Sequence, residues 1–196
     1  MNEILSTPTR RQFMGGAAAM GSGLALGIPM LLQPTQALAA DAAPEIGVWV
    51  VIQPDETVVV RIVRSEMGQG TLTGLAQLVA EELECDWSKV TTEYPTPGES
   101  LKRKRVWGSY STGGSRGIRE SQEYVRQGGA AARIMLIQAA ANSWGVSADQ
   151  CTAANGIITH SASAQKVSYG KVADAAAKLP VPAPAQIKLK DPKEWK

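Results

Sequence analysis

A glycine-bracketed turn between a predicted strand and a predicted helix constrains this chain more than any other feature. Before the turn, residues 58–63 are β-branched apart from one arginine, and after it leucine and valine recur at helical spacing up to residue 83. Glycine lets a backbone approach a ligand closely, and the first N–H groups of a helix form a cup suited to an anion. We therefore predict a turn that binds a phosphate or a cofactor, with a plain surface turn as the alternative; its residues are Glu66, Met67, Gly68, Gln69 and Gly70.

A second turn of similar composition lies further along the chain. Its two hydroxyls, several backbone N–H groups and one guanidinium are the donors that a phosphate or pyrophosphate needs. The alternative is a surface loop rich in glycine and serine. The turn consists of Thr112, Gly113, Gly114, Ser115 and Arg116.

Together these segments resemble the molybdenum hydroxylases related to xanthine oxidase. The likeness is carried by residues 65–70, 78–83 and 112–116, in that order. It is strongest for the large (beta) subunits of isoquinoline 1-oxidoreductase and of related bacterial aldehyde dehydrogenases. The resemblance implies that Gly68, Gln69 and Gly70 contact the pterin or the oxygen ligand of the metal, and that the second turn holds the phosphate end of the cofactor.

The resemblance also implies a reaction and a set of partners. The cofactor is molybdenum–molybdopterin cytosine dinucleotide, and an aldehyde or N-heterocycle is hydroxylated with oxygen from water. Electrons leave through a small 2Fe-2S subunit and then a cytochrome c subunit or a quinone. In full-length relatives the glutamate that acts as general base lies far towards the C-terminus. We therefore expect no catalytic residue and no metal ligand in this stretch, and an inactive chain when it stands alone.

Two positions near the turns stand apart from the resemblance. Relatives often carry a further serine after the arginine, whereas this chain has Gly117, so one expected hydroxyl contact is missing. Glu66 is interpreted as orienting its loop, because nothing in the sequence indicates that it acts as a base.

The first 39 residues predict a twin-arginine export signal. Residues 9–14 match the pattern around Arg10 and Arg11, residues 15–32 are apolar but rich in glycine and alanine, and a small-x-small cleavage site ends at Ala39. We expect a periplasmic protein that begins at Ala40 and meets the inner membrane through its partners. A membrane anchor is the alternative, since the apolar stretch is nearly long enough to span a bilayer.

Residues 40–179 are predicted to form a partial molybdopterin-binding domain with mixed α/β (α+β) layers. Residues 180–196 are rich in proline and are expected to connect to a further, missing portion. We expect strands at 49–52, 57–64, 89–94 and 106–110, a polar loop at 95–104, and helices at 71–85, 117–143 and 168–178. Asn155 and Gly156 predict a hairpin between strands at 151–154 and 157–160, and Gly128 and Gly129 suggest close helix packing.

Charge and the remaining reactive side chains exclude several classes of protein. Beyond residue 39 the chain has 18 Lys+Arg against 17 Asp+Glu (20 minus two Arg, 18 minus one Glu), which does not indicate nucleic-acid binding. Cys85 and Cys151 are too far apart in the sequence for an iron–sulfur cluster, and they either pair or lie in the core. His160 has no second ligand nearby and is interpreted as structural or exposed.

Three readings remain open at this level. The basic run Lys102, Arg103, Lys104 and Arg105 is either a solvated loop or a docking patch for an acidic partner subunit. The whole chain is alternatively a stand-alone, non-catalytic exported α/β protein, for example one that assists assembly. An exported nucleotide-binding enzyme is disfavoured, because no Walker-type lysine follows Gly70 and no Rossmann spacing is present.

Overall fold

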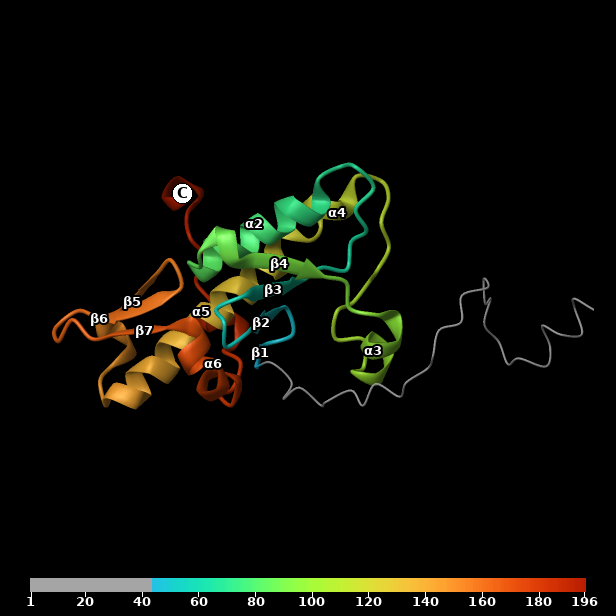
Figure 1. The fold of residues 1–196 in the computed structure, drawn as a ribbon. Helices are drawn as coiled ribbons and strands as arrows, with labels where there is room; N and C mark the ends of the chain where they lie inside the picture. Colours follow the sequence, from blue (N-terminus) through green and yellow to red (C-terminus); the bar gives the residue numbers. More distant parts are fainter. Residues whose placement is uncertain (1–43) are drawn as a thin grey trace, which may run out of the picture. The chain divides into compact units, whose positions relative to one another are not determined.

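In the computed structural model, which describes residues 44–196, a four-stranded sheet is covered by three helices (Figure 1). Helix α2 (Thr71–Leu83) contacts β4, α5 (Gln122–Trp144) contacts β2, and α6 (Tyr169–Ala177) contacts β1 and β2. The expected mixture of helices and sheet is confirmed. The predicted export signal lies outside the described residues. Among the described residues, no helix has the length and apolar character needed to cross a membrane.

The main sheet has the strand order β1-β2-β3-β4. Its strands are β1 (Glu45–Ile46), β2 (Val50–Ile52), β3 (Val58–Arg61) and β4 (Val90–Glu93). β3 and β4 are parallel, and the other pairs are antiparallel. The parallel pair requires a crossover connection, which α2 supplies, so the first predicted turn falls between β3 and α2. The strands expected at 49–52 and 89–94 are confirmed, the one expected at 57–64 ends at Arg61, and β1 was not predicted.

The packing of α5 against α2 depends on glycine. A Cβ atom at Gly129 would lie 2.6 Å from the backbone oxygen of Val79, and one at Gly128 would lie 2.8 Å from Trp49 Cδ1. Real Cβ atoms do not approach backbone oxygens so closely, so only glycine allows the two helix backbones this spacing. The expectation that these glycines permit close packing is confirmed. The helix predicted at 71–85 is also confirmed, ending at Leu83.

The long helix predicted at 117–143 is wrong in its first turns. The chain forms a short helix α4 (Arg116–Arg119), breaks, and starts again as α5. Ser121 lies buried at the break, where its Oγ accepts hydrogen bonds from Arg64 Nε at 3.0 Å and from the Tyr124 hydroxyl at 2.6 Å. These contacts come from tertiary packing, which overrides the helical pattern.

Residues 95–110 also differ from expectation. The predicted polar loop contains a helix, α3 (Pro97–Lys102), whose first turn is a capping box between Thr96 and Glu99. The strand predicted at 106–110 does not form. Instead, the Trp107 indole N–H donates to the backbone oxygen of Val48 at 2.8 Å, so a buried side chain rather than a strand ladder holds this segment.

The second sheet has the order β5-β6-β7, with β5 (Cys151–Ala154), β6 (Ile157–His160) and β7 (Lys166–Ser168). The predicted hairpin is confirmed, and both of its turn residues have positive φ, 48° at Asn155 and 73° at Gly156. β7 was not predicted, and the last predicted helix is confirmed as α6. His160 is buried with its Nδ1 2.7 Å from Ser163 Oγ, as a structural histidine would be. Both cysteines are free thiols.

The segment after α6 lies against α2 and α5. Fully buried Glu82 accepts hydrogen bonds from Arg126 Nε at 2.8 Å and from the Lys190 backbone N–H at 3.1 Å. Arg126 Nη2 in turn donates to the Lys190 carbonyl at 2.7 Å. A buried carboxylate is costly unless it is paired, so this segment supplies part of what stabilises Glu82.

Candidate functional site

The first predicted turn directly precedes α2, and two glycines give it its shape. Gly68 has φ of 88° and Gly70, the residue that caps the helix, has φ of 74°. Residues other than glycine rarely adopt such left-handed backbone conformations. The glycines are therefore required by the path of the backbone, and the turn itself is exposed.

The helix N-terminus in this turn is occupied by the chain's own carboxylate. Glu66 Oε1 accepts from the N–H groups of Gly68 at 2.8 Å and Gly70 at 2.9 Å, and Oε2 accepts from Leu72 N–H at 2.9 Å. The bond from Leu72, followed by that from Gly70, holds the pKa of Glu66 below its ordinary value. The expected cup of free N–H groups is therefore wrong for these three positions, and the interpretation that Glu66 orients the loop agrees with its contacts.

Gln69 is folded back onto the same turn. Its Oε1 accepts from the Met67 N–H at 2.5 Å, and its Nε2 donates to the Ser65 carbonyl at 2.8 Å. Both ends of the amide thus bind the loop backbone, although the residue is exposed. A contact with a cofactor requires Gln69 to exchange one of these two hydrogen bonds.

The second turn keeps its backbone N–H groups available, whereas its Arg116 guanidinium already binds neighbouring residues. Within residues 44–196, no hydrogen bond engages the backbone N–H groups of Gly113, Gly114 or Ser115. The Arg116 guanidinium spans the turn, with Nε 3.2 Å from the Gly113 carbonyl and Nη2 3.0 Å from Ser111 Oγ. Exposed N–H groups beside a hydroxyl and a guanidinium form a set of donors that suits an anionic oxygen.

The structure brings the two turns together. The Ser65 N–H donates to Thr112 Oγ1 at 2.9 Å, which joins the start of the first turn to the start of the second. Gly117 lies against the first residue of α2, where an added Cβ would be 2.7 Å from Thr71 Oγ1. The missing serine after the arginine thus has a physical explanation, because a side chain at this position would collide with Thr71.

Arg64 is a site residue that sequence reasoning missed. It is 5% exposed, and its guanidinium donates to the carbonyl of Ser111 and to Ser121 Oγ, with Glu120 Oε2 3.8 Å from Nη2. These partners lie just before and just after the second turn, whereas Arg64 precedes the first. The only signal in the sequence is a charged residue at the end of an apolar strand.

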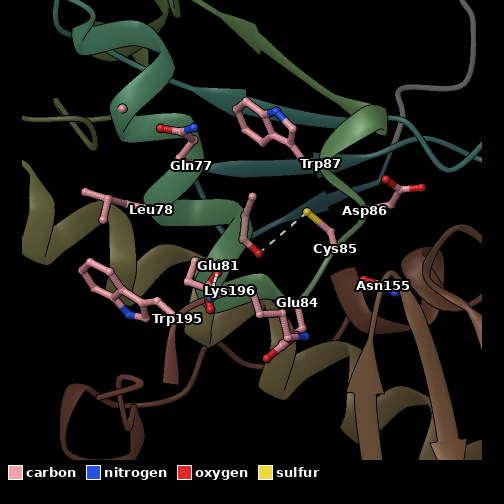
Figure 2. Close-up of a pocket in the computed structure, with 12 residues that line it drawn as sticks. Gln77, Leu78, Glu81, Glu84, Cys85, Asp86, Trp87, Asn155, Trp195 and Lys196 are labelled. Atoms are coloured by element: carbon pink, nitrogen blue, oxygen red, sulfur yellow. Dashed lines mark hydrogen bonds and ion pairs between the residues drawn. The ribbon is translucent and has the colours of Figure 1, made fainter. Parts of the chain in front are cut away.

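A groove of about 680 Å³ runs along α2 and contains none of the predicted site residues (Figure 2). Trp87, Trp195, Glu81 and Glu84 are among the residues that line it. Cys85 lines the groove, but burial raises the pKa of its thiol to about 12, so it is not a nucleophile at neutral pH. Among the described residues there is no group of three or more His, Cys, Asp or Glu side chains placed to hold a metal ion.

Comparisons with known proteins identify the family of this chain. Residues 7–196 match the molybdopterin cofactor-binding domain family. Over 170 residues the chain is 34% identical to the membrane-bound aldehyde dehydrogenase (pyrroloquinoline-quinone) of Gluconacetobacter polyoxogenes, covering 84% of this chain and 21% of that protein. Over 167 residues it is 32% identical to isoquinoline 1-oxidoreductase subunit beta of Brevundimonas diminuta, again covering 84% and 21%.

Among solved structures, quinoline 2-oxidoreductase from Pseudomonas putida 86 matches 64% of this chain and 15% of its own, with 18% identity and a TM-score of 0.49. The chain spans about a fifth of the length of the curated relatives it matches. The match over residues 7–196 and the identity to two curated relatives together show that the chain belongs to the molybdopterin cofactor-binding domain family, which confirms its resemblance to the xanthine oxidase group of molybdenum enzymes.

Proposed function

We propose that this chain forms the first cofactor-contacting part of the large subunit of a molybdenum hydroxylase, which oxidises an aldehyde or an N-heterocycle with water as the oxygen source. Family membership supports a molybdopterin-binding oxidoreductase domain. The names of the two curated relatives, an aldehyde dehydrogenase and an isoquinoline oxidoreductase subunit, support these two substrate classes.

The observation that carries this proposal is the hydrogen bond between Ser65 N–H and Thr112 Oγ1. It places two Gly-rich turns, 47 residues apart in the sequence, side by side at one end of α2. One anionic cofactor can therefore contact both turns at once. Neither turn alone surrounds a ligand.

The residues present fit the phosphate end of such a cofactor. The N–H groups of Gly113, Gly114 and Ser115 and the guanidinium of Arg116 bind it at the second turn. At the first turn, Glu66 already satisfies the N–H groups of the helix start. The first turn therefore contributes a backbone that the cofactor can approach closely, together with the neutral amide of Gln69. A neutral amide both donates and accepts without adding charge.

When bound, the cofactor supplies the redox chemistry, and this chain supplies binding and orientation. We assign it no catalytic base, and we expect the chain alone to be inactive. The cytosine dinucleotide form of the cofactor, the small 2Fe-2S subunit and the cytochrome c subunit belong to the same proposal. So does export to the periplasm by the twin-arginine pathway.

Metal and nucleotide analysis of the protein, purified from its natural host with the rest of its enzyme, tests the proposal. We expect molybdenum and, after acid hydrolysis, a cytidine nucleotide. Arg116→Gln should lower both contents, whereas Arg119→Gln, an exposed neighbour on α4, should change neither. The presence of pyrroloquinoline quinone without molybdenum would overturn the proposal, because one relative is named for that cofactor. Absence of both would favour the non-catalytic exported protein.

A further inference from the structure

The last residues of α3 and the turn that follows it carry three exposed cations. This basic turn consists of Leu101, Lys102, Arg103, Lys104, Arg105 and Val106. Lys102, Lys104 and Arg105 are exposed, and none of them forms an ion pair with any of the described residues. Leu101 and Val106 flank them with exposed fractions of 60% and 37%. The surface thus combines positive charge with two aliphatic side chains at its edges.

The fourth cation of the run, Arg103, is paired within the protein. Arg103 forms an ion pair with Glu45 on β1, and its Cζ lies 4.7 Å from the centre of the Trp107 ring. Burial acts to raise the pKa of Glu45, but hydrogen bonds from Arg103 and Arg61 outweigh it and hold that pKa below its ordinary value. Glu45 therefore remains charged at neutral pH and fastens the basic turn to the sheet.

The backbone of the basic turn is also held in one conformation. Lys104 and Arg105 both have left-handed φ values, 56° and 60°, which cost free energy for residues with side chains. Two hydrogen bonds offset this cost, from Arg105 N–H to the Ser100 carbonyl at 2.6 Å and from Gly108 N–H to the Arg105 carbonyl at 2.8 Å. The backbone positions that carry the three cations are therefore held in one conformation.

We propose that the basic turn is a docking surface for the acidic face of a partner protein. Charge complementarity requires carboxylates on the partner, and Leu101 and Val106, at the edges of the basic turn, require apolar side chains beside those carboxylates. A preformed surface loses little conformational entropy on binding, and charged rims accelerate encounter with an oppositely charged partner.

Two other classes of partner fit this surface less well. Anionic membranes are recognised by clusters of about four to eight cations, whereas three are free here. Single-stranded nucleic acid needs aromatic side chains on which bases stack, and the apolar residues of the basic turn are aliphatic. A structured acidic protein surface therefore agrees best with its shape and composition.

The basic turn lies close in the sequence to the second predicted cofactor turn. Residues 107–111 connect it directly to the second turn, and the Tyr110 hydroxyl donates to the Thr96 carbonyl at 3.3 Å. Figure 1 shows α3 standing apart from α2 and the sheet, beyond the end of β4. A partner on the basic turn thus lies on the same side as the predicted cofactor turns, but its binding does not require a bound cofactor.

Binding measurements on the purified protein test this proposal. The probes are a peptide of alternating glutamate and leucine, the same peptide with glutamine for glutamate, vesicles of equal parts phosphatidylserine and phosphatidylcholine, and single-stranded DNA. The variant Lys102→Gln/Lys104→Gln/Arg105→Gln removes the three cations. The matched control, Lys166→Gln/Lys171→Gln/Lys178→Gln, removes three exposed lysines, one from β7, one from α6 and one at the C-cap of α6.

We expect the glutamate peptide to bind the unmodified protein and the control, and to bind the triple variant about tenfold more weakly, as the loss of three exposed charge contacts predicts. Leu101→Ala/Val106→Ala should also weaken binding. Equal binding to the control and the triple variant would overturn the proposal, as would tighter binding to vesicles or DNA than to the peptide. Near-identical circular dichroism and thermal unfolding of the variants will show that a loss of binding is not a loss of fold.

Discussion

The backbone N–H of Ser65 donates a 2.9 Å hydrogen bond to the side-chain oxygen of Thr112, across 47 residues of sequence. This bond joins the strand end that begins the first Gly-rich turn to the loop that begins the second. It leaves the Thr112 hydroxyl hydrogen available for another acceptor, since a hydroxyl both accepts and donates. One residue thus links the two turns and remains able to contact a ligand.

Thr112→Val should uncouple the two turns with little loss of stability. The variant keeps the shape of the side chain and removes the acceptor, and Ser65 is exposed, so its N–H can turn to water. We expect the free energy of unfolding to fall by about 0.5–1.5 kcal/mol. Hydrogen exchange at the Ser65 amide should become faster. Thr112→Ser retains the oxygen and serves as the control, and equal exchange in both variants would contradict the role of this bond.

Arg64→Lys should destabilise the protein more than Thr112→Val does. Lysine retains the charge but cannot reproduce the contacts of a guanidinium with both the Ser111 carbonyl and Ser121 Oγ. Because these groups lie in a part-buried to buried region, we expect a loss of about 1–3 kcal/mol in urea unfolding. Arg119→Lys, at an exposed position, should be neutral. An Arg64→Lys protein as stable as the control would show that the hydrogen bonds of Arg64 are dispensable for stability.

The first turn should loosen in acid. Hydrogen bonds from Leu72 and Gly70 lower the pKa of Glu66 in the folded chain. A depressed carboxyl pKa stabilises the turn above the unfolded pKa, and the contribution is lost as the pH falls through the folded pKa. Amide exchange at Gly68, Gly70 and Leu72 should therefore accelerate, beyond the intrinsic rate change, below about pH 4.3, the ordinary glutamate pKa.

Glu66→Gln should abolish that extra pH dependence and raise amide exchange at neutral pH, because an NH2 group, which cannot accept a hydrogen bond, replaces one carboxylate oxygen. Asp174→Asn, an exposed change on α6, should alter neither the pH dependence of exchange in the first turn nor its rate at neutral pH. If the Glu66→Gln protein retained the acid response, another group would control the turn.

Gly117→Ser should test whether a side chain at position 117 collides with Thr71. The new Cβ would lie 2.7 Å from Thr71 Oγ1 and 3.0 Å from its Cγ2. Thr71 is buried, so overpacking should cost about 1–3 kcal/mol. Combining the change with Thr71→Ala should recover part of that loss in a double-mutant cycle. Simple additivity of the two single losses would show that the residues do not collide.

Replacement of Arg10 and Arg11 by lysine should retain the precursor in the cytoplasm. Twin-arginine export depends on the pair itself rather than on its charge. Cell fractionation with immunodetection measures the outcome, and a variant with the arginines intact but Gln12→Ala is the control. Appearance of the Lys-Lys protein in the periplasm would indicate another route of export.

Several elements could be predicted because their signals are local. The turn at Asn155 and Gly156 needs two positive φ values, and α2 follows from the spacing of its leucines, so a few neighbouring residues suffice. Helix α3 was missed although its capping box at Thr96 and Glu99 is equally local. The strand predicted at 106–110 failed because Trp107 binds Val48 through its side chain, a contact with a partner far away in the sequence.

The sequence by itself determined that two Gly-rich turns exist and that each precedes a helix, because glycine placement and periodicity are properties of neighbouring residues. The family followed from the resemblance of these motifs to those of known proteins. Only the tertiary structure decided which donors remain available. Tyr94 and Thr112 accept from the N–H groups of Glu66 and Ser65 and so set the path of the first turn. That path directs the Glu66 carboxylate onto the start of α2, because long-range contacts, rather than local pattern, determine where a loop side chain points.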